Sequence, residues 1–544
     1  MRTGTFFAKK DLSKNFKSCM LESGRKNKIP RFMRARGESM VAKVNSTGLT
    51  GIEGHLVICE CDLSGGLPRL DIVGLPGASV RESQDRVRAA AKNCGFQFPA
   101  RRITINLAPG ELRKEGPIYD LPIWAGILAA SGQLPLPPED SCMLGELSLE
   151  GEVRAANGVL PMALCAREMG MKSIFVPADN ACEAAIAEGL TVYPVHHARE
   201  LAAHLLGQKS IEPQPPVAFE NAVPQGLDFS DVMGQENVKR GLEIAAAGSH
   251  NVLLIGSPGS GKSMLSRRLP SILPDMTREE ALEVTKVYSV AGLLEKGRPV
   301  VTQRPFRSPH HTVSAAGLAG GGRTPRPGEI SLAHNGVLFL DELPEYHSDA
   351  LEVLRQPLED GCITVSRVSG SCTYPSRFML VCAMNPCKCG YYGHPTRPCT
   401  CTEQSVRAYR KRLSGPLLDR IDLHIDVAPV AFESLRERTP AESSAAVRAR
   451  VNAARARQTA RYAGTEVTCN ATLTPARMAQ FCALDEAGKT LMQRAFDVMG
   501  LTARAYDRIL KVARTIADLD GQENISAGHL AEAIQFRAFD TEKQ

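Results

Sequence analysis

The stretch from residue 251 to residue 263, NVLLIGSPGSGKS, decides the fold of this chain. Its first part, Asn251 to Ile255, has the length and composition of a short buried strand. The strand leads directly into a complete GxxxxGK[ST] motif. The residues of this motif are Gly256, Ser257, Pro258, Gly259, Ser260, Gly261, Lys262 and Ser263. With a helix expected from Met264 to Leu269, the pattern predicts a nucleotide-binding α/β domain.

Each part of the motif has a chemical role. Glycines let the backbone bend so that successive N–H groups point into one concavity, where a polyphosphate can bind at the N-terminus of a helix. We expect Lys262 to reach the β and γ phosphates and the Ser263 hydroxyl to ligate Mg²⁺. A glycine-rich turn that matches by chance is the alternative. The coincidence of strand, motif and helix favours a nucleoside triphosphate site.

The composition is that of a globular chain with several domains. Its 544 residues are 43% hydrophobic and 23% charged, which suggests three or four domains of about 150 residues each. No apolar run is long enough for a membrane span and no segment resembles a secretory signal, so we expect a cytoplasmic protein without a membrane partner. The sixteen cysteines are then expected to be free thiols or metal ligands. A net charge of +6 permits a nucleic-acid partner without requiring one.

Residues 1–39 differ from the rest of the chain. Residues 1–40 hold eleven Lys or Arg and three acidic residues, with no sustained helical period. A poorly ordered basic leader is expected, and a tail that touches nucleic acid is the alternative. The composition of the sequence changes at Met40, so translation starts either at Met1 or at Met40. The intact mass of the native protein distinguishes the two.

Residues 40–206 alternate strand-like and helix-like segments, as expected for one α/β domain. The expected strands are 55–61, 69–73, 102–107 and 173–176. The expected helices are 78–93, 121–130, 158–169, 181–188 and 198–206. Residues 207–227 contain four prolines and are expected to form a linker.

Part of this first domain resembles the proteolytic domain of Lon-type proteases. The resemblance rests on Gly116-Pro117 before a helix and on LGELSLEGEVRAANGVLPMALCAREMGMKSIFVP at 144–177. Those enzymes need a Ser nucleophile and a Lys base. The matching positions here hold Ile118 and Leu160, and neither side chain can serve. The resemblance therefore implies a Lon-like α/β fold without the protease dyad.

A second apolar strand ends in two acids, in the sequence GVLFLDEL at 336–343. At the carboxyl edge of a parallel sheet beside the phosphate loop, Asp341 would hold the Mg²⁺ shell and Glu342 would polarise the attacking water. Acidic pairs after strands often only cap the next helix. In a chain with a complete phosphate loop, the catalytic interpretation is favoured.

Three further segments resemble parts of AAA+ ATPases. The lead-in at 229–236, FSDVMGQE, matches a segment that packs near the adenine. Asn385 follows a strand at 378–384 and fits sensor 1, which orients the water; an Asn capping the turn before Pro386 is the alternative. Arg420, in SGPLLDRID, resembles the arginine finger that enters a neighbouring subunit's site. A surface ion pair with Asp419 or Asp422 is the alternative for Arg420.

Two longer segments, RPFRSPHHT at 304–312 and PGEISLAHNGVLFLDELPE at 327–345, extend this likeness. Together with the motifs above, they resemble the YifB/ComM family of magnesium-chelatase-like AAA+ ATPases, from about Met40 to Phe539. The resemblance implies ATP and Mg²⁺ as cofactors, an ATPase core at 228–430 and a homohexameric ring. It also implies that Arg504 is sensor 2, contacting the γ-phosphate from a helical lid. Arg508, one turn later, is a rival.

Residues 361–377 have two strand-like arms about Ser369-Gly370. In the family that the chain resembles, a hairpin before sensor 1 projects into the pore of the ring. Arg367 near its tip could meet a phosphate backbone, and a merely solvated arginine is the alternative. The segment 293–326 corresponds to an insertion whose loops would also face the pore.

Four cysteines follow sensor 1 in two CxC arms: Cys387, Cys389, Cys399 and Cys401. Four thiols so close in sequence suit a tetrahedral Zn²⁺ site, although CxxC arms are the usual spacing. The loop between the arms has little apolar material to hold it folded without a metal. We expect structural zinc here, with four free thiols as the alternative.

The C-terminal region, 431–544, is expected to form the helical lid. Its helices are expected at 445–462, 475–496, 502–519 and 526–536, with Ser526 as an N-cap. Two basic runs, at 407–412 and 448–461, suit either a nucleic-acid face or solvated helix surfaces.

Two functions are consistent with these motifs. The resemblance to ComM implies a DNA motor that performs branch migration or acts as a helicase on branched or single-stranded DNA. The resemblance to the magnesium chelatase motor subunit implies remodelling of a protein partner. The complete Lon-like domain and the cysteine-rich insertion favour the first. A protease is a third class, and its dyad is missing.

Overall fold

The computed structural model describes residues 41–219, 226–295, 297–322, 325–367, 370–429 and 441–537. The expected basic leader and the choice between Met1 and Met40 lie outside these residues. So do residues 220–225 of the expected linker and 431–440 of the expected lid. Among the described residues, no helix combines the length and the apolar character that crossing a bilayer requires.

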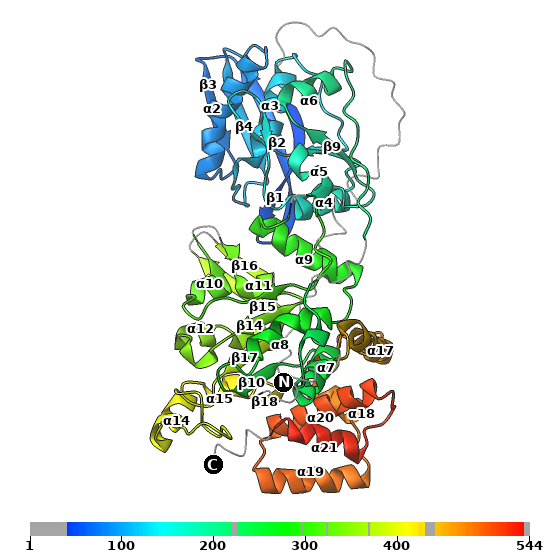
Figure 1. The fold of residues 1–544 in the computed structure, drawn as a ribbon. Coiled ribbons are helices and arrows are strands. Elements are labelled where there is room, and N and C mark those ends of the chain that lie inside the picture. The colour runs from blue at the N-terminus through cyan, green and yellow to red at the C-terminus, as the bar shows by residue number, and fades with distance from the viewer. Residues whose placement is uncertain are drawn as a thin grey trace, which may run out of the picture. The chain divides into compact units, whose positions relative to one another are not determined.

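A seven-stranded mixed sheet forms the centre of residues 41–206, in the order β3-β4-β2-β1-β5-β8-β9. Its strands are β1 (Ala42–Thr50), β2 (Glu53–Ser64), β3 (Arg69–Val73), β4 (Arg102–Ala108), β5 (Ser141–Met143), β8 (Ser173–Pro177) and β9 (Thr191–Val195). A small hairpin joins β6 (Glu146–Leu147) to β7 (Val153–Arg154). The helices are α2 (Ala78–Asn93), α3 (Asp120–Ala130), α4 (Val159–Glu168), α5 (Ala181–Ala184) and α6 (Ala198–Leu205). Figure 1 labels β1 to β4, β9 and α2 to α6 among these elements.

Most of the elements expected in this region are present. The bounds of β3 and α2 are the predicted ones. The helix predicted at 181–188 is shorter, because α5 ends at Ala184 and the chain then turns through Gly189, whose φ is +87°. Ile118 and Leu160, which the resemblance to Lon-type proteases aligns with the dyad, are both buried in the apolar core.

A five-stranded parallel sheet, in the order β11-β14-β17-β10-β18, carries the phosphate loop. Its strands are β10 (Val252–Gly256), β11 (Phe306–Arg307), β14 (Val337–Leu340), β17 (Met379–Met384) and β18 (Leu423–Val427). Every residue of β14 and β17 is buried, as expected for strands covered on both faces. Because the strands are parallel, the residues that follow β10, β14 and β17 meet at one edge of the sheet.

Helices and two hairpins surround this sheet. The helices are α7 (Glu236–Gly248), α8 (Lys262–Arg268), α9 (Arg278–Ala291), α10 (Ala315–Ala319), α11 (Glu329–Leu332), α12 (Ser348–Glu352), α13 (Arg355–Asp360), α14 (Glu403–Arg410) and α15 (Gly415–Leu418). The predicted hairpin is present as β15 (Cys362–Arg367) and β16 (Gly370–Pro375). A second, smaller hairpin pairs β12 (Gly320–Gly321) with β13 (Arg326–Pro327).

The C-terminal region is helical in its described residues. Its helices are α17 (Ser444–Arg461), α18 (Pro475–Phe481), α19 (Glu486–Met499), α20 (Ala503–Leu519) and α21 (Ala527–Gln535), and α18 to α21 form one cluster in Figure 1. The prediction of a single helix at 475–496 is wrong. The chain leaves the helix after Phe481, and α19 begins anew because the Asp485 side chain accepts a hydrogen bond from the backbone N–H of Gly488 at 2.7 Å. Ser526 is the N-cap of α21, as predicted.

Candidate functional site: a phosphate loop at the carboxyl edge of the parallel sheet

The phosphate loop joins β10 to α8 with the geometry that its glycines allow. Gly259 and Gly261 have φ of +79° and +95°, which a residue with a side chain adopts only with strain. At Gly256, an added Cβ would lie 2.4 Å from the carbonyl oxygen of Val427 on β18. The loop therefore depends on glycine both for its turn and for its close approach to the neighbouring strand.

Lys262 joins the loop to the end of the next strand. Its Nζ donates to the carbonyl oxygens of Gly256 at 2.7 Å and Ser257 at 2.9 Å, and to Asn385 Oδ1 at 3.2 Å. Burial lowers the pKa of Lys262, and the carboxylates of Asp341 and Glu342 oppose that shift. These three neutral oxygens hold the ammonium group beside the loop, where its positive charge would favour an anion such as a phosphate.

Ser263 and Asp341 form the second contact across this edge. The Ser263 hydroxyl donates to Asp341 Oδ2 at 2.6 Å, although the two residues lie 78 positions apart in the chain. Hydroxyl and carboxylate oxygens are ligands that Mg²⁺ prefers, together with phosphate oxygens. The donor set therefore fits the Mg²⁺ that accompanies a nucleoside triphosphate.

Glu342 lies beside this pair in an uncommon backbone conformation. Its φ is +52°, in the left-handed region, and its side chain is 56% exposed. The Oε2 atom lies 3.4 Å from Nδ1 of His311. His311 comes from the SPHHT segment, which follows β11 and which the Tyr346 hydroxyl fixes by donating to Pro309 O at 2.7 Å. The sequence singles out SPHHT but does not assign His311 to the acid; the pairing of β11 with β14 brings them together.

We predict that His311→Ala lowers the kcat of ATP hydrolysis about tenfold and leaves KM nearly unchanged, because His311 contacts the carboxylate of Glu342 at 3.4 Å and a loss of about 1.4 kcal/mol in the transition state corresponds to a tenfold change in rate. Steady-state kinetics measures both constants, and His311→Asn should restore part of the rate. His347→Ala is the control, since His347 is an exposed histidine at the N-cap of α12, whereas the ring of His310 packs on that of His311 at 4.1 Å. Equal losses in both alanine variants would contradict the role of His311.

A pocket lies beside the last residues of β10. Its lining residues come from α7, β10, β18 and the end of α21: Asn237, Ile255, His424, Ile425, Asp426, Gln535 and Phe536. Gln235 of the lead-in has φ of +60°, and its side-chain amide donates to Ala428 O at 2.5 Å. Asn237, two residues after Gln235, lines the pocket, so the pocket lies beside the end of the lead-in and the end of the strand that enters the phosphate loop. Asn237, Asp426 and Gln535 are polar lining residues that the motifs alone do not identify.

Arg420 lies at the other edge of the sheet. Its carbonyl oxygen accepts from the side-chain amide of Asn251 at 2.9 Å, at the start of β10, whereas the phosphate loop follows the end of that strand. The guanidinium donates to Pro416 O at 2.6 Å and pairs with Glu359. An ion pair within the chain, the predicted alternative for Arg420, is therefore present, but its acid is Glu359 rather than Asp419 or Asp422.

The two arginines near the start of α20 differ in their surroundings. Arg504 is 64% exposed, and its Nη1 lies 3.8 Å from the carboxylate of Asp419. Arg508 pairs with the buried carboxylate of Asp422. Arg508 is thus held by the core, and Arg504 is the arginine that faces solvent. Through Asp419, Arg504 is placed at the same sheet edge as Arg420.

Asp422 is a buried anion that joins the sheet to the C-terminal helices. Its carboxylate accepts from the backbone N–H of Asn251 at 2.9 Å, and His250 lies at 3.6 Å. Burial alone would raise the pKa of Asp422, but the Arg508 guanidinium and His250 hold it well below its usual range. The carboxylate is therefore ionised in the folded chain.

We predict that Asp422→Asn destabilises the ATPase region by about 3–5 kcal/mol at pH 7, because Arg508 loses its buried partner. A depressed pKa in the folded state stabilises the fold above the unfolded pKa of about 3.9 and loses this effect as pH falls below it. The difference between wild type and variant should therefore shrink as pH falls below about 4. Urea unfolding measures it. Asp419→Asn is the control, with an expected change below about 0.5 kcal/mol.

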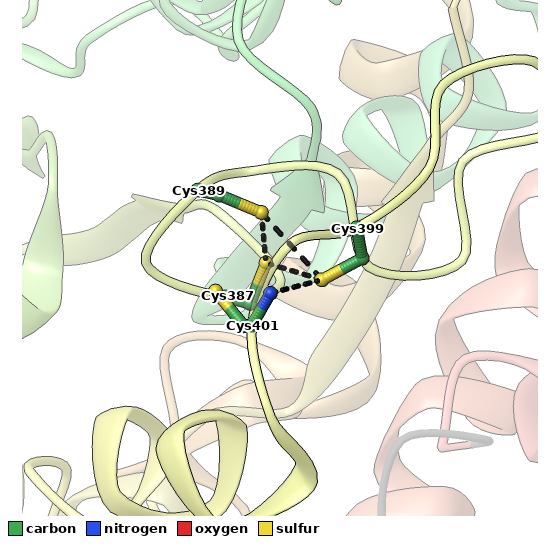
Figure 2. A group of neighbouring side chains, drawn as sticks. All are labelled: Cys387, Cys389, Cys399 and Cys401. Carbon is green, nitrogen blue, oxygen red and sulfur yellow. Dashed lines mark hydrogen bonds between the residues drawn. The ribbon is translucent and has the colours of Figure 1, made fainter.

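The four predicted cysteine ligands converge at the end of β17. The sulfur atoms of Cys387 and Cys389 are 3.4 Å apart, and that of Cys399 lies 3.7 Å and 3.5 Å from them. All four sulfurs lie within 4.8 Å of one another (Figure 2). Four sulfurs around one Zn²⁺ at about 2.3 Å would be about 3.8 Å apart. The backbone N–H groups of Tyr391 and Thr400 lower the pKa of Cys389 to about 5, which favours a thiolate, whereas burial and the neighbouring thiols raise the pKa of Cys399 and of Cys401. The four donors thus fit a tetrahedral Zn²⁺ ion.

The basic runs have different surroundings. Arg450, Arg457 and Arg461 of α17 bind groups of the protein itself, at Glu243 (2.6 Å), the Asp518 carbonyl (2.7 Å) and the Asp518 carboxylate. This favours a structural role for α17 rather than a nucleic-acid face. Arg407 on α14 is 78% exposed. Arg367, at the end of β15, is also exposed.

One edge of the parallel sheet carries the phosphate loop, the hydrogen-bonded pair of Ser263 and Asp341, and Asn385 at the end of β17. Together these features define a P-loop ATPase core. Family models agree along most of the chain. "Magnesium chelatase, subunit ChlI" matches residues 228–435, "Subunit ChlI of Mg-chelatase" matches 59–180, and "Magnesium chelatase, subunit ChlI C-terminal" matches 441–537.

Comparison with individual relatives shows which family within this class contains the chain. "Uncharacterized protein YifB" of Escherichia coli is 46% identical over 501 residues, covering 91% of this chain and 97% of the relative. "Competence protein ComM" of Haemophilus influenzae is 44% identical over 505 residues, covering 92% and 97%. "Lon protease" of Rhizobium meliloti is 26% identical over 222 residues, 38% of this chain and 27% of that protease. The chain belongs to the YifB/ComM family of magnesium-chelatase-like AAA+ ATPases.

Proposed function

We propose that the protein is a ring-forming motor that hydrolyses ATP with Mg²⁺ and acts on DNA. The ATPase assignment rests on two hydrogen bonds at the carboxyl edge of the sheet. One joins Lys262 to Asn385, and the other joins Ser263 to Asp341. The main-chain N–H groups of the loop and Lys262 hold the phosphates. Ser263 and Asp341 hold Mg²⁺, which would neutralise charge on the phosphates. Glu342 polarises the attacking water, and Asn385 orients it.

Two arginines complete the site from a neighbouring subunit. Arg420 and Arg504 contact groups at the sheet edge opposite the phosphate loop, which supports a role for both in a neighbouring subunit's site. In a head-to-tail ring, that edge faces the phosphate loop of the next subunit. We propose a homohexamer on this basis and from the family. Residues 40–206 act as a Lon-like domain without protease chemistry, 228–430 as the ATPase core and 431–544 as the lid.

DNA is the proposed substrate because of the likeness to ComM, whose name is that of a competence protein, and because of exposed Arg367 on the hairpin. In a ring, β15 and β16 would project into the pore, where Arg367 would meet the phosphate backbone. A single hairpin arginine repeated in every subunit forms a ring of positive charge. Branched or single-stranded DNA would pass through it during branch migration or unwinding.

ATP turnover with and without DNA tests this substrate. The assay compares branched, single-stranded and duplex DNA at one salt concentration, since phosphate contacts are strongly salt-dependent. The variant Glu342→Gln, loaded with ATP, should retain the preferred DNA in a filter or mobility assay. Stimulation together with retention supports the DNA motor. If no DNA stimulates turnover and none is retained, the DNA motor is excluded and remodelling of a protein partner takes its place.

The four-cysteine cluster is proposed to hold one structural Zn²⁺. We predict about one zinc per chain in protein purified without added metal, measured by inductively coupled plasma mass spectrometry. Cys399→Ser should lower that content strongly and lower the melting temperature, since few apolar side chains hold the loop otherwise. Cys182→Ser, which changes an exposed thiol elsewhere, is the control. Less than about half an equivalent in the wild type would contradict the site.

A further inference from the structure

We propose that the cysteine cluster and the phosphate loop are coupled, so that a bound nucleotide slows release of the metal and the bound metal raises nucleotide affinity. This inference rests on the proposed ATP and zinc sites and adds a regulatory link between them. The metal would stabilise the shape of the nucleotide site and not only that of the cysteine loop.

The first support is a direct contact between the two loops. Gly390 lies next to the ligand Cys389, and its backbone packs on the ring of Pro258 in the phosphate motif. A Cβ added at Gly390 would lie 2.5 Å from Cδ and 2.7 Å from Cγ of Pro258. Such distances leave no room for a side chain. The position of Pro258 therefore depends on the path of the cysteine loop.

The second support is that the other arm continues from the nucleotide site itself. Cys387 follows Asn385 by two residues, and Asn385 accepts the hydrogen bond from Lys262 at 3.2 Å. Cys387 is fully buried, so its arm is part of the sheet edge rather than a free loop. The cysteine loop thus contacts the nucleotide site twice, at the third residue of the phosphate motif and through Asn385.

The third support is the composition of the loop. Between Cys389 and Cys399 the sequence is GYYGHPTRP, in which Tyr392 is 43% exposed and Arg397 lies over the Tyr391 ring at 5.4 Å. Little apolar surface is available to fix the backbone. The four sulfurs would therefore set the shape of the loop that presses on Pro258. Since linkage is reciprocal, any preference of the metal-bound shape for nucleotide is matched by a preference of the nucleotide-bound site for metal.

The test measures metal release from zinc-loaded full-length protein with the chromogenic chelator 4-(2-pyridylazo)resorcinol. The release rate is compared without nucleotide and with saturating ADP or a non-hydrolysable ATP analogue. Typical couplings change affinity about 5- to 150-fold, and affinity changes fall mainly on the dissociation rate, so we expect nucleotide to slow release at least about fivefold. Lys262→Ala should abolish this protection, which excludes direct binding of zinc by the nucleotide. Protection that persists in Lys262→Ala would overturn the coupling.

Two glycines of the loop provide a matched pair of variants. Gly390 and Gly393 have φ of +84° and +73°, so alanine is similarly strained at both, but a Cβ at Gly393 meets nothing within 4 Å. We expect Gly390→Ala to lose the protection and Gly393→Ala to keep it. Pro258→Ala, which removes the ring from the other side, should reduce protection while zinc stays bound. If Gly390→Ala fails to fold, Pro258→Ala is the deciding variant. Undiminished protection against zinc release in Pro258→Ala would overturn the inference.

The reverse direction uses a fluorescent ATP analogue. Its Kd for zinc-loaded protein should be at least about fivefold lower than for protein stripped by the chelator, since the coupling is the same in both directions. Equal release rates with and without nucleotide, in wild type that binds the analogue and one zinc, would overturn the inference and leave the ATPase intact. Absence of analogue binding in the wild type would overturn the proposed function itself.

Discussion

Replacing Glu342 by Gln is expected to lower ATP turnover about 10²- to 10⁴-fold, because the variant loses the group that polarises the attacking water. Nucleotide binding should persist, since Lys262, Ser263 and Asp341 are unchanged. The amide is nearly isosteric with the carboxylate, so the φ of +52° at this position is not further strained. Phosphate release under saturating ATP measures turnover, and a fluorescent nucleotide measures affinity.

The control for this variant is Glu345→Gln, three residues further along the chain. Glu345 pairs with Arg412 at 3.0 Å and is 43% exposed, so its loss should change turnover by less than about twofold. A Glu342→Gln enzyme that keeps more than about a tenth of the wild-type rate would show that another group activates the water. His311, which contacts Glu342, would then need a different explanation as well.

Replacing Arg420 by Ala is expected to lower turnover about 10³- to 10⁵-fold if the arginine serves the neighbouring site. The Arg420 side chain is only 12% exposed, so the substitution removes packing and is expected to lower stability, whereas the carboxylate of Glu359 that loses its partner is 56% exposed and adds little to this cost. Nucleotide affinity should change little. Arg407→Ala removes an arginine that is 78% exposed on α14 and serves as the control.

A mixture of two inactive variants tests whether Arg420 acts between subunits. Arg420→Ala keeps an intact phosphate loop, and Lys262→Ala keeps an intact arginine. In rings mixed at equal amounts, about a quarter of the head-to-tail interfaces would combine both intact halves, so up to about a quarter of the wild-type turnover should return. A mixture as inactive as its components, in rings shown to exchange subunits, would place Arg420 outside the catalytic machinery.

The nucleotide edge is the part of the molecule that the sequence predicts best. The phosphate motif is local, and the strands before Asp341 and Asn385 are short apolar runs whose burial is visible in their composition. Because the strands are parallel, their carboxyl ends meet at one edge of the sheet, and no further sequence pattern is needed to predict this arrangement. The contact of Lys262 with Asn385 follows from this rule.

Other features depend on packing that no local pattern shows. β1 does not have the composition of a strand, because Ser46 and Thr47 are polar, yet both are fully buried between β2 and β5. Arg504 and Arg508 lie one turn apart on the same helix and have the same chemistry. Only the position of Asp422 at the start of β18 separates the buried arginine from the exposed one.

The separation of the phosphate loop from Arg420 has a consequence for the amount of protein present. In the proposed ring, a single chain would bind its nucleotide but would supply Arg420 and Arg504 to the site of a neighbouring subunit. Specific activity should therefore rise with protein concentration and fall on dilution, in contrast to an enzyme whose site lies within one chain. At low copy number the protein would hold ATP without consuming it, and assembly, for example on a substrate that gathers several copies, would start hydrolysis.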